Sequence, residues 1–145
     1  GKYCDLEEKP VRFPDRDDLY VVLYDLLEKR PKNIQVDYGN VEIFLPHRTV
    51  GKDPLTYNYL GARSQAIFMK KIELRMWAEV HDFMDEQKHR YGVAYIDCVH
   101  LFLNRFGITA ITEEAFLKNY YRWRSIVRRK EKKREYHKKK CTEQV

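Results

Sequence analysis

The sequence TEEAFLKNYYRWRSIVRRKEKKREYHKKK, residues 112–140, decides the fold expected for this chain. It contains neither Gly nor Pro, so it predicts one long helix. Thr112 is a suitable N-cap because its hydroxyl can accept a backbone N–H, and the two glutamates after it suit the positive end of the helix dipole. Beyond Val127 lysine and arginine replace the apolar residues, so the helix is expected to project or fray there.

The two sides of this helix differ in chemistry. At a period of 3.6 residues, one face is apolar and consists of Phe116, Tyr120, Trp123 and Val127, with Leu117 beside it. The opposite face consists of Lys118, Arg122, Ser125 and Arg129. The apolar face predicts docking on a core, whereas the cationic face predicts contact with an anionic partner.

Charge is distributed unevenly along the chain. Residues 118–145 contain 12 Lys+Arg and 3 Asp+Glu, whereas residues 1–117 contain 16 Lys+Arg and 19 Asp+Glu. A basic end on a mildly acidic body favours a nucleic acid or an anionic membrane surface as the partner, although a solubilising tail has the same composition. The three cysteines form no CxxC pair, which favours a reducing, intracellular and hence cytoplasmic location. No run of about 18 apolar residues exists, so no membrane-spanning segment is expected.

Upstream of this stretch, apolar spacing predicts helices over 16–29, 62–91 and 93–106. Alternating apolar residues around a Gly-Asn pair predict a β-hairpin at 34–45. The linker 107–111 begins with glycine and joins two predicted helices, as in a helix-turn-helix pair. The expected fold is therefore mainly α (α+β): a small helical domain with one β-hairpin, a helix-turn-helix-like C-terminal helix pair and a basic C-terminal extension.

Domain boundaries follow from the same reading. Residues 1–14 are a polar N-terminal arm, residues 15–130 form a single domain, and residues 131–145 are a basic tail or helix extension.

The apolar face expected for the helix at 62–91 is broad and consists of Phe68, Met69, Ile72, Met76, Trp77, Val80, Phe83 and Met84.

His81, Asp85 and His89 follow one another at i, i+4 and i+8 on the helix predicted at 62–91. Imidazole and carboxylate are ligands of zinc and iron. However, positions i and i+8 lie about 12 Å apart along a helix, too far for one ion to bind all three. We therefore expect a solvated polar ridge, with neither a metal nor another cofactor.

The function predicted from this arrangement is binding of nucleic acid, with DNA favoured over RNA, in a regulatory or accessory role. The predicted contact residues are Lys118, Asn119, Arg122, Ser125, Arg128, Arg129, Lys132, Lys133 and Arg134. Arginine can bond guanine and asparagine can bond adenine in bidentate fashion, while the cations near the C-terminus suit phosphates. Tyr121 lies off the apolar face and leaves open a second form of binding, in which bases of a single strand stack on its ring.

An alternative from another class is a protein-interaction or oligomerisation module whose C-terminal helix docks on an acidic partner or on a second copy, as a homodimer. Enzymatic function is not expected, because no nucleophile elbow, dinucleotide-binding turn or HExxH motif is present. Eleven tyrosines leave a tyrosine nucleophile open as a type of chemistry, but nothing in the sequence singles one out.

Overall fold

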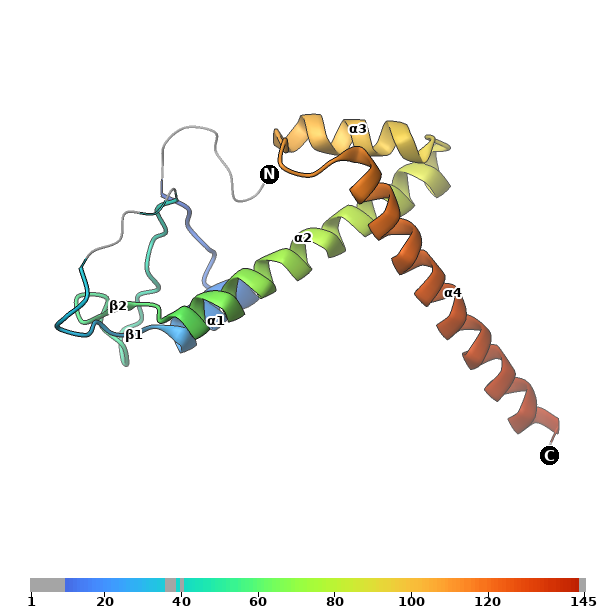
Figure 1. Cartoon of the computed structure of the whole chain (residues 1–145). Helices are drawn as coiled ribbons and strands as arrows, with labels where there is room; N and C mark the ends of the chain where they lie inside the picture. The colour runs from blue at the N-terminus through green and yellow to red at the C-terminus, as the bar shows by residue number, and fades with distance from the viewer. Residues whose placement is uncertain (1–9, 36–38, 40, 144–145) are drawn as a thin grey trace. The chain divides into compact units, whose positions relative to one another are not determined.

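The computed structural model describes residues 10–35, 39 and 41–143 and is mainly helical (Figure 1). Its elements are α1 (Asp18–Leu26), β1 (Glu28–Lys29), β2 (Tyr57–Tyr59), α2 (Ala62–Tyr91), α3 (Tyr95–Phe106) and α4 (Glu113–Glu143). The mainly helical fold class is confirmed, and the β-structure includes a small antiparallel sheet of two strands. The chain forms two compact units, residues 1–75 and 76–145, and α2 contributes to both.

In the first unit, α1 is shorter than the helix predicted over 16–29. It begins at Asp18 because Asp17 is its N-cap and accepts a hydrogen bond of 2.9 Å from the backbone N–H of Leu19. It ends at Leu26 because Leu27 has an extended backbone. The two residues that follow form β1, which pairs with β2, so pairing within the sheet replaces the last turn of the predicted helix.

The β-hairpin predicted at 34–45 is not where the two strands lie. Residues 36–38 and 40, at its centre, lie outside the described residues. The described part of its second half contacts the N-terminal arm, through a parallel bridge between Val11 and Ile43. An alternating pattern identifies an extended segment but does not identify the segment that pairs with it, so the pairing within the predicted hairpin stays a prediction.

The loop before β2, which contains Gly51 and Lys52, has a structural role in the first unit. The Nζ of Lys52 donates to the carbonyls of Tyr24 at 2.9 Å and Asp25 at 2.7 Å, and so supplies a cation to the C-terminal turn of α1, which has none of its own. The backbone N–H of Lys52 donates to Tyr24 Oη at 2.9 Å. Gly51 has a φ of +117°, and a Cβ there would lie 2.0 Å from the same hydroxyl oxygen. Only glycine fits this turn.

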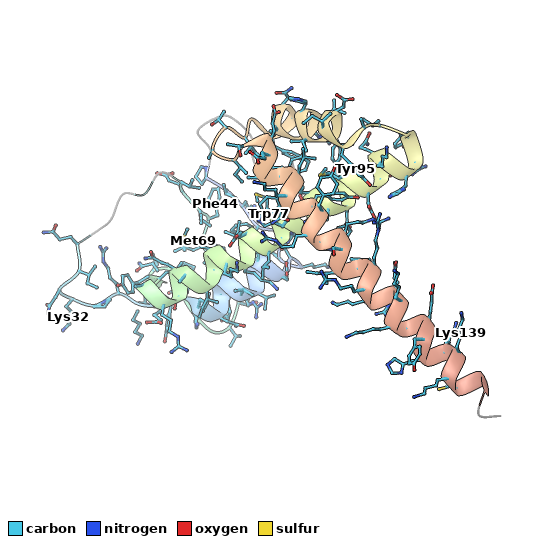
Figure 2. The ribbon with its side chains drawn as sticks, turned by 45° about the vertical axis from the view of Figure 1, so that its right-hand side comes forward. Lys32, Phe44, Met69, Trp77, Tyr95 and Lys139 are labelled. Atoms are coloured by element: carbon cyan, nitrogen blue, oxygen red, sulfur yellow. The ribbon has the colours of Figure 1, made fainter. Side chains whose placement is uncertain are left out.

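The core of the first unit is built mainly from α1 and one buried residue of α2. Its buried members are Phe13, Leu19, Tyr20, Leu23, Leu27 and Phe68. Met69, labelled in Figure 2, is 68% exposed and Ile72 is also exposed, so the apolar face predicted for α2 is too broad in this region. A contact between residues distant in sequence decides which part of an apolar face is covered, and helical spacing does not contain that information.

In the second unit, the helix boundaries after residue 91 agree with the prediction. Gly107 ends α3 with a φ of +59°, and the backbone N–H of Ile108 donates to the carbonyl of Leu103 at 3.0 Å, as in a Schellman motif. Thr112 Oγ1 accepts a hydrogen bond of 3.3 Å from the N–H of Ala115, which confirms it as the N-cap of α4. α4 then continues without a break to Glu143, so most of the basic end is a helix extension.

Candidate nucleic-acid interface

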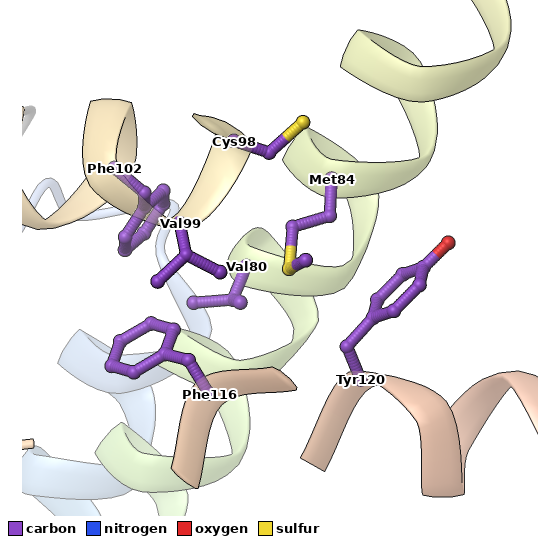
Figure 3. Packing of buried hydrophobic residues seen from close by; sticks show 7 residues of the cluster. All are labelled: Val80, Met84, Cys98, Val99, Phe102, Phe116 and Tyr120. Carbon is purple, nitrogen blue, oxygen red and sulfur yellow. The ribbon is translucent and has the colours of Figure 1, made fainter. Parts of the chain in front are cut away.

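The apolar face of α4 fixes the helix to the core of the second unit. Phe116 and Tyr120 are fully buried, and Trp123 packs beside them. Their neighbours come from α2 and α3 and include Val80, Met84, Cys98, Val99 and Phe102 (Figure 3). The predicted division of α4 into a buried face and a free face is confirmed for these residues. The face of α4 that carries Phe116, Tyr120 and Trp123 is therefore packed within the unit and is not a free surface.

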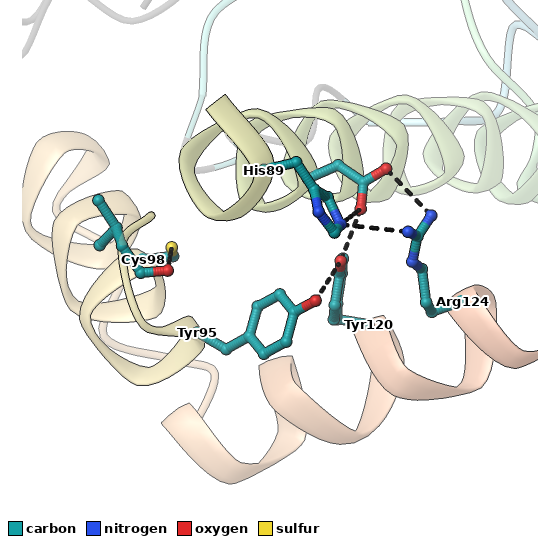
Figure 4. A network of polar contacts seen from close by, with 7 residues as sticks. His89, Tyr95, Cys98, Tyr120 and Arg124 are labelled. Atoms are coloured by element: carbon teal, nitrogen blue, oxygen red, sulfur yellow. Dashed lines mark hydrogen bonds and ion pairs between the residues drawn. The ribbon is translucent and has the colours of Figure 1, made fainter. Parts of the chain in front are cut away.

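A polar network at the edge of this core connects α2, α3 and α4 (Figure 4). Tyr120 Oη donates to Asp85 Oδ1 at 2.6 Å, and Arg124 Nη1 donates to Asp85 Oδ2 at 3.3 Å. Arg124 Nη2 lies 3.1 Å from His89 Nε2, and the hydroxyl of Tyr95 lies 3.4 Å from that of Tyr120. Burial and the hydrogen bond to Asp85 raise the pKa of Tyr120, so its hydroxyl stays a neutral donor at physiological pH.

His81 is also enclosed by α4. It is 8% exposed, its ring stacks on Trp123 with centroids 4.5 Å apart, and its Nε2 lies 2.7 Å from Asn119 Oδ1. The solvated ridge predicted for His81, Asp85 and His89 is therefore wrong for His81 and Asp85, which α4 covers at least in part. His89 also contacts α4, through Arg124, but remains exposed. Within the part of the chain that the structure describes, no three His, Cys, Asp or Glu side chains are grouped so as to hold a metal ion.

The contact with His81 also changes the expected role of Asn119. Its amide oxygen is used inside the unit, and the side chain lies between the buried face and the solvent face of α4. Asn119 is thus a packing residue in this structure and is not placed to bond adenine through its oxygen. From its spacing alone, Asn119 could either contact DNA or pack against a neighbouring helix. The structure shows that it packs against α2 through His81.

The opposite face of α4 is exposed and cationic. Its exposed cations are Lys118, Arg122, Arg129, Lys132 and Lys133, with Arg128 at its side. Arg134 is exposed as well, but it lies beyond the core on the side of α4 that carries Phe116 and Val127. Side chains as far along α4 as Lys139 extend away from the core of the unit (Figure 2). We call this surface, from Lys118 to Lys133, the basic face of α4.

Ion pairs within the chain leave most of the basic face available. Lys118 contacts Glu114 at 2.7 Å, but both side chains are more than two-thirds exposed, and such a surface pair contributes little. Arg129 donates to the hydroxyl of Ser125 at 3.2 Å, a neutral partner. Among the residues with described positions, no carboxylate lies within ion-pair distance of Arg122 or Arg129.

The structure brings four of the predicted contact residues together in a groove of about 350 Å³: Ser125, Arg128, Arg129 and Lys132. The groove also contains Tyr95, Tyr120, Tyr121 and Arg124. We call this the tyrosine groove. The predicted residues Lys118, Asn119, Arg122, Lys133 and Arg134 do not line it.

Sequence reasoning missed Tyr95 and Arg124 as parts of this site. Arg124 lies next to Tyr120 on the helical wheel, at the edge of the buried face. A guanidinium at such an edge needs a carboxylate partner, because burying an unpaired charge is costly. The need for such a partner could have indicated that Arg124 pairs with a carboxylate of another helix, and in the structure this partner is Asp85.

Two further findings concern the chain as a whole. Although α2 and α4 are long, no helix among the described residues is apolar enough over a sufficient length to cross a bilayer. Comparison with protein-family models, with curated proteins and with solved structures finds no significant match.

Proposed function

We propose that this protein binds nucleic acid through the basic face of α4, with duplex DNA as the preferred form. The observation that carries the proposal is the pairing of a buried ring-bearing face with an exposed cationic face on one helix. Because packing fixes the buried face, the cations on the other side are presented together at a defined angle rather than on a loose tail. Neutralising phosphates with such cations releases counterions and gives most of the affinity of non-specific binding.

The dimensions of α4 suit a duplex. An α-helix with its side chains is about 10–12 Å wide, close to the width of the major groove of B-DNA. Lys118 and Lys133 are fifteen residues apart, so the basic face extends about 22 Å along the helix. The first turn of α4 carries Glu113 and Glu114, which phosphates would repel. The proposed contact therefore begins one turn later, at Lys118.

In this proposal α3 and α4 act as a helix-turn-helix-like pair in which α3 supports α4. Three contacts favour such support: the buried residues of α3 pack on Phe116, the Gly107 turn is closed by backbone hydrogen bonds, and His100 Nδ1 lies 3.0 Å from Glu113 Oε1. Of the cations offered to DNA, Arg122 and Arg129 lie on the outer side of α4 and are the candidates for base contacts, because arginine bonds guanine in bidentate fashion. The remaining lysines and arginines would contact phosphates.

The experiment is a titration of a fluorescently labelled 20-base-pair duplex at low salt, with binding read by anisotropy. The variant Arg122→Ala with Arg129→Ala should bind at least tenfold more weakly than wild type, while its circular dichroism spectrum is unchanged. The matched control is Arg16→Ala with Arg63→Ala, which removes two exposed arginines of the first unit and changes the net charge equally. Equal weakening by both double variants would show that charge alone decides binding, and would remove α4 from the proposal.

Interaction with an acidic protein partner is the competing outcome. Phe116 and Tyr120 cannot serve as a docking surface, since both are fully buried within the second unit. Such a partner would have to bind the cations instead. Poly-glutamate as competitor separates the two cases: it should displace wild-type protein from the duplex far less effectively than an unlabelled duplex of equal charge, and the reverse order would favour the protein partner.

A further inference from the structure

The tyrosine groove has a composition that differs from the rest of the basic face. It combines three phenol rings with four cationic side chains, and no carboxylate is among the residues that line it. Its volume of about 350 Å³ lies within the usual range of 300–1,000 Å³ for small-ligand sites. A groove of this size can hold one monomer of a larger ligand.

One ring of the groove is open to a ligand. Tyr121 is 52% exposed, whereas Tyr120 beside it is fully buried. The ring of Tyr121 meets that of Tyr95 edge to face, with centroids 5.7 Å apart and planes at 86°. This contact positions the Tyr121 ring and leaves a large part of it uncovered. An exposed, positioned aromatic ring is the element on which proteins stack the bases of unpaired nucleotides.

The cations of the groove fall into two groups. Arg124 is engaged, because its guanidinium contacts Asp85 and His89 in the network at the core edge (Figure 4). Arg128 and Lys132 are exposed, and in the described portion of the chain no carboxylate pairs with either. They lie one helical turn apart on α4, and Arg128 is two turns from Tyr121. An anion bound by this pair therefore lies near the open ring.

We propose that the tyrosine groove receives one unpaired nucleotide, with its base stacked on Tyr121 and its phosphate held by Arg128 and Lys132. This inference rests on the proposed function and deepens it: the preferred ligand is a duplex that carries an unpaired end or bulge beside the segment bound by the basic face. Stacking of one base on an aromatic side chain changes affinity by roughly 5- to 150-fold. The groove thus adds a structural preference that the cations alone do not give.

The test uses the full chain and three labelled 20-base-pair duplexes: one blunt, one with a three-nucleotide thymidine overhang, and one with a three-residue abasic overhang. Wild type should bind the thymidine overhang at least fivefold more tightly than the other two. Tyr121→Ala should reduce this preference to about one, and its circular dichroism spectrum should match that of wild type, because the side chain is more than half exposed. Tyr121→Phe, which keeps the ring, should retain the preference.

The possible failures are distinguishable. Binding of all three duplexes with equal affinity by wild type would overturn the groove proposal and leave the basic face of α4 intact. A preference that survives in Tyr121→Ala, or that the abasic overhang reproduces, would overturn the stacking role. Absence of binding to every duplex at low salt would overturn the proposed function itself, and the groove proposal with it.

Discussion

Replacing Tyr120 with phenylalanine removes one hydroxyl from the polar network that joins α4 to α2. The ring is fully buried, and its Oη donates to the Asp85 carboxylate at 2.6 Å. A hydrogen bond to a charged group contributes about 1.5–3 kcal/mol. Arg124 also contacts Asp85, at 3.3 Å, and keeps a partner for the carboxylate when the hydroxyl is removed. We therefore expect a loss near the middle of this range, about 2 kcal/mol in the free energy of unfolding. For a chain of this size, the melting temperature falls by roughly 4–8 °C.

The loss of stability caused by Tyr120→Phe should become smaller at high pH. Burial and the hydrogen bond to Asp85 raise the pKa of Tyr120 in the folded state above its usual value of 10.0. The folded state therefore holds this proton more tightly than the unfolded state. The stability contributed by the hydroxyl is fully present below about pH 10 and is lost as the pH rises from there towards the folded-state pKa. In that window, the difference between wild type and Tyr120→Phe should shrink by about 1.4 kcal/mol for each pH unit.

Urea unfolding at pH 7 and at pH 11, followed by circular dichroism, measures both effects. The matched control is Tyr136→Phe, the same chemical change at a position of α4 that is 62% exposed, and its effect should be close to zero at both pH values. A loss below about 0.5 kcal/mol for Tyr120→Phe at pH 7, or an equal loss in the control, would refute the assignment of the network as a structural anchor of α4.

Two further predictions test other parts of the structure. Gly51→Ala should lower the free energy of unfolding by about 1–3 kcal/mol, since the residue has a positive φ and the new Cβ would meet Tyr24 Oη. Gly39→Ala, with nothing within 4 Å of its Cβ, is the control and should be nearly neutral. Denaturant unfolding compares the two variants, and equal effects would contradict the structural role of the loop around Gly51. Cys141 is exposed and should react with iodoacetamide in the native protein, whereas Cys98, whose burial raises the pKa of its thiol, should react only after unfolding. Mass spectrometry of the labelled peptides gives the order of reaction. Rapid labelling of Cys98 in the native protein would contradict its place in the core.

Local signals in the sequence predicted most of the helical structure. Gly107 and Thr112 identify the end of α3 and the start of α4, because a left-handed residue and a hydroxyl cap act within a few residues of themselves. The 3.6-residue period predicted which side of α4 is buried, since Phe116 and Tyr120 are hidden and Arg122 is exposed. These features depend on short-range geometry, which a sequence contains directly.

The predictions that failed depend on which segments meet. Alternation at 41–45 predicted an extended segment, but it could not identify Val11 as the residue with which Ile43 forms a bridge. His81 and Asp85 were expected to face solvent because they lie opposite the apolar face predicted for α2. In the structure, α4 covers them with Trp123 and Tyr120. The tyrosine groove could not be predicted for the same reason, because it requires residues of α3 and α4 to meet.

The salt dependence of duplex binding tests the central claim most directly. If the basic face of α4 neutralises four to six phosphates, a plot of log K against log salt concentration should have a slope of about −4 to −5 for wild type. The variant Lys118→Ala with Lys133→Ala should have a slope shallower by about two, because both exposed lysines are assigned to phosphates in the proposed contact. Identical slopes for the two proteins, or no binding by wild type at the lowest salt, would contradict the account.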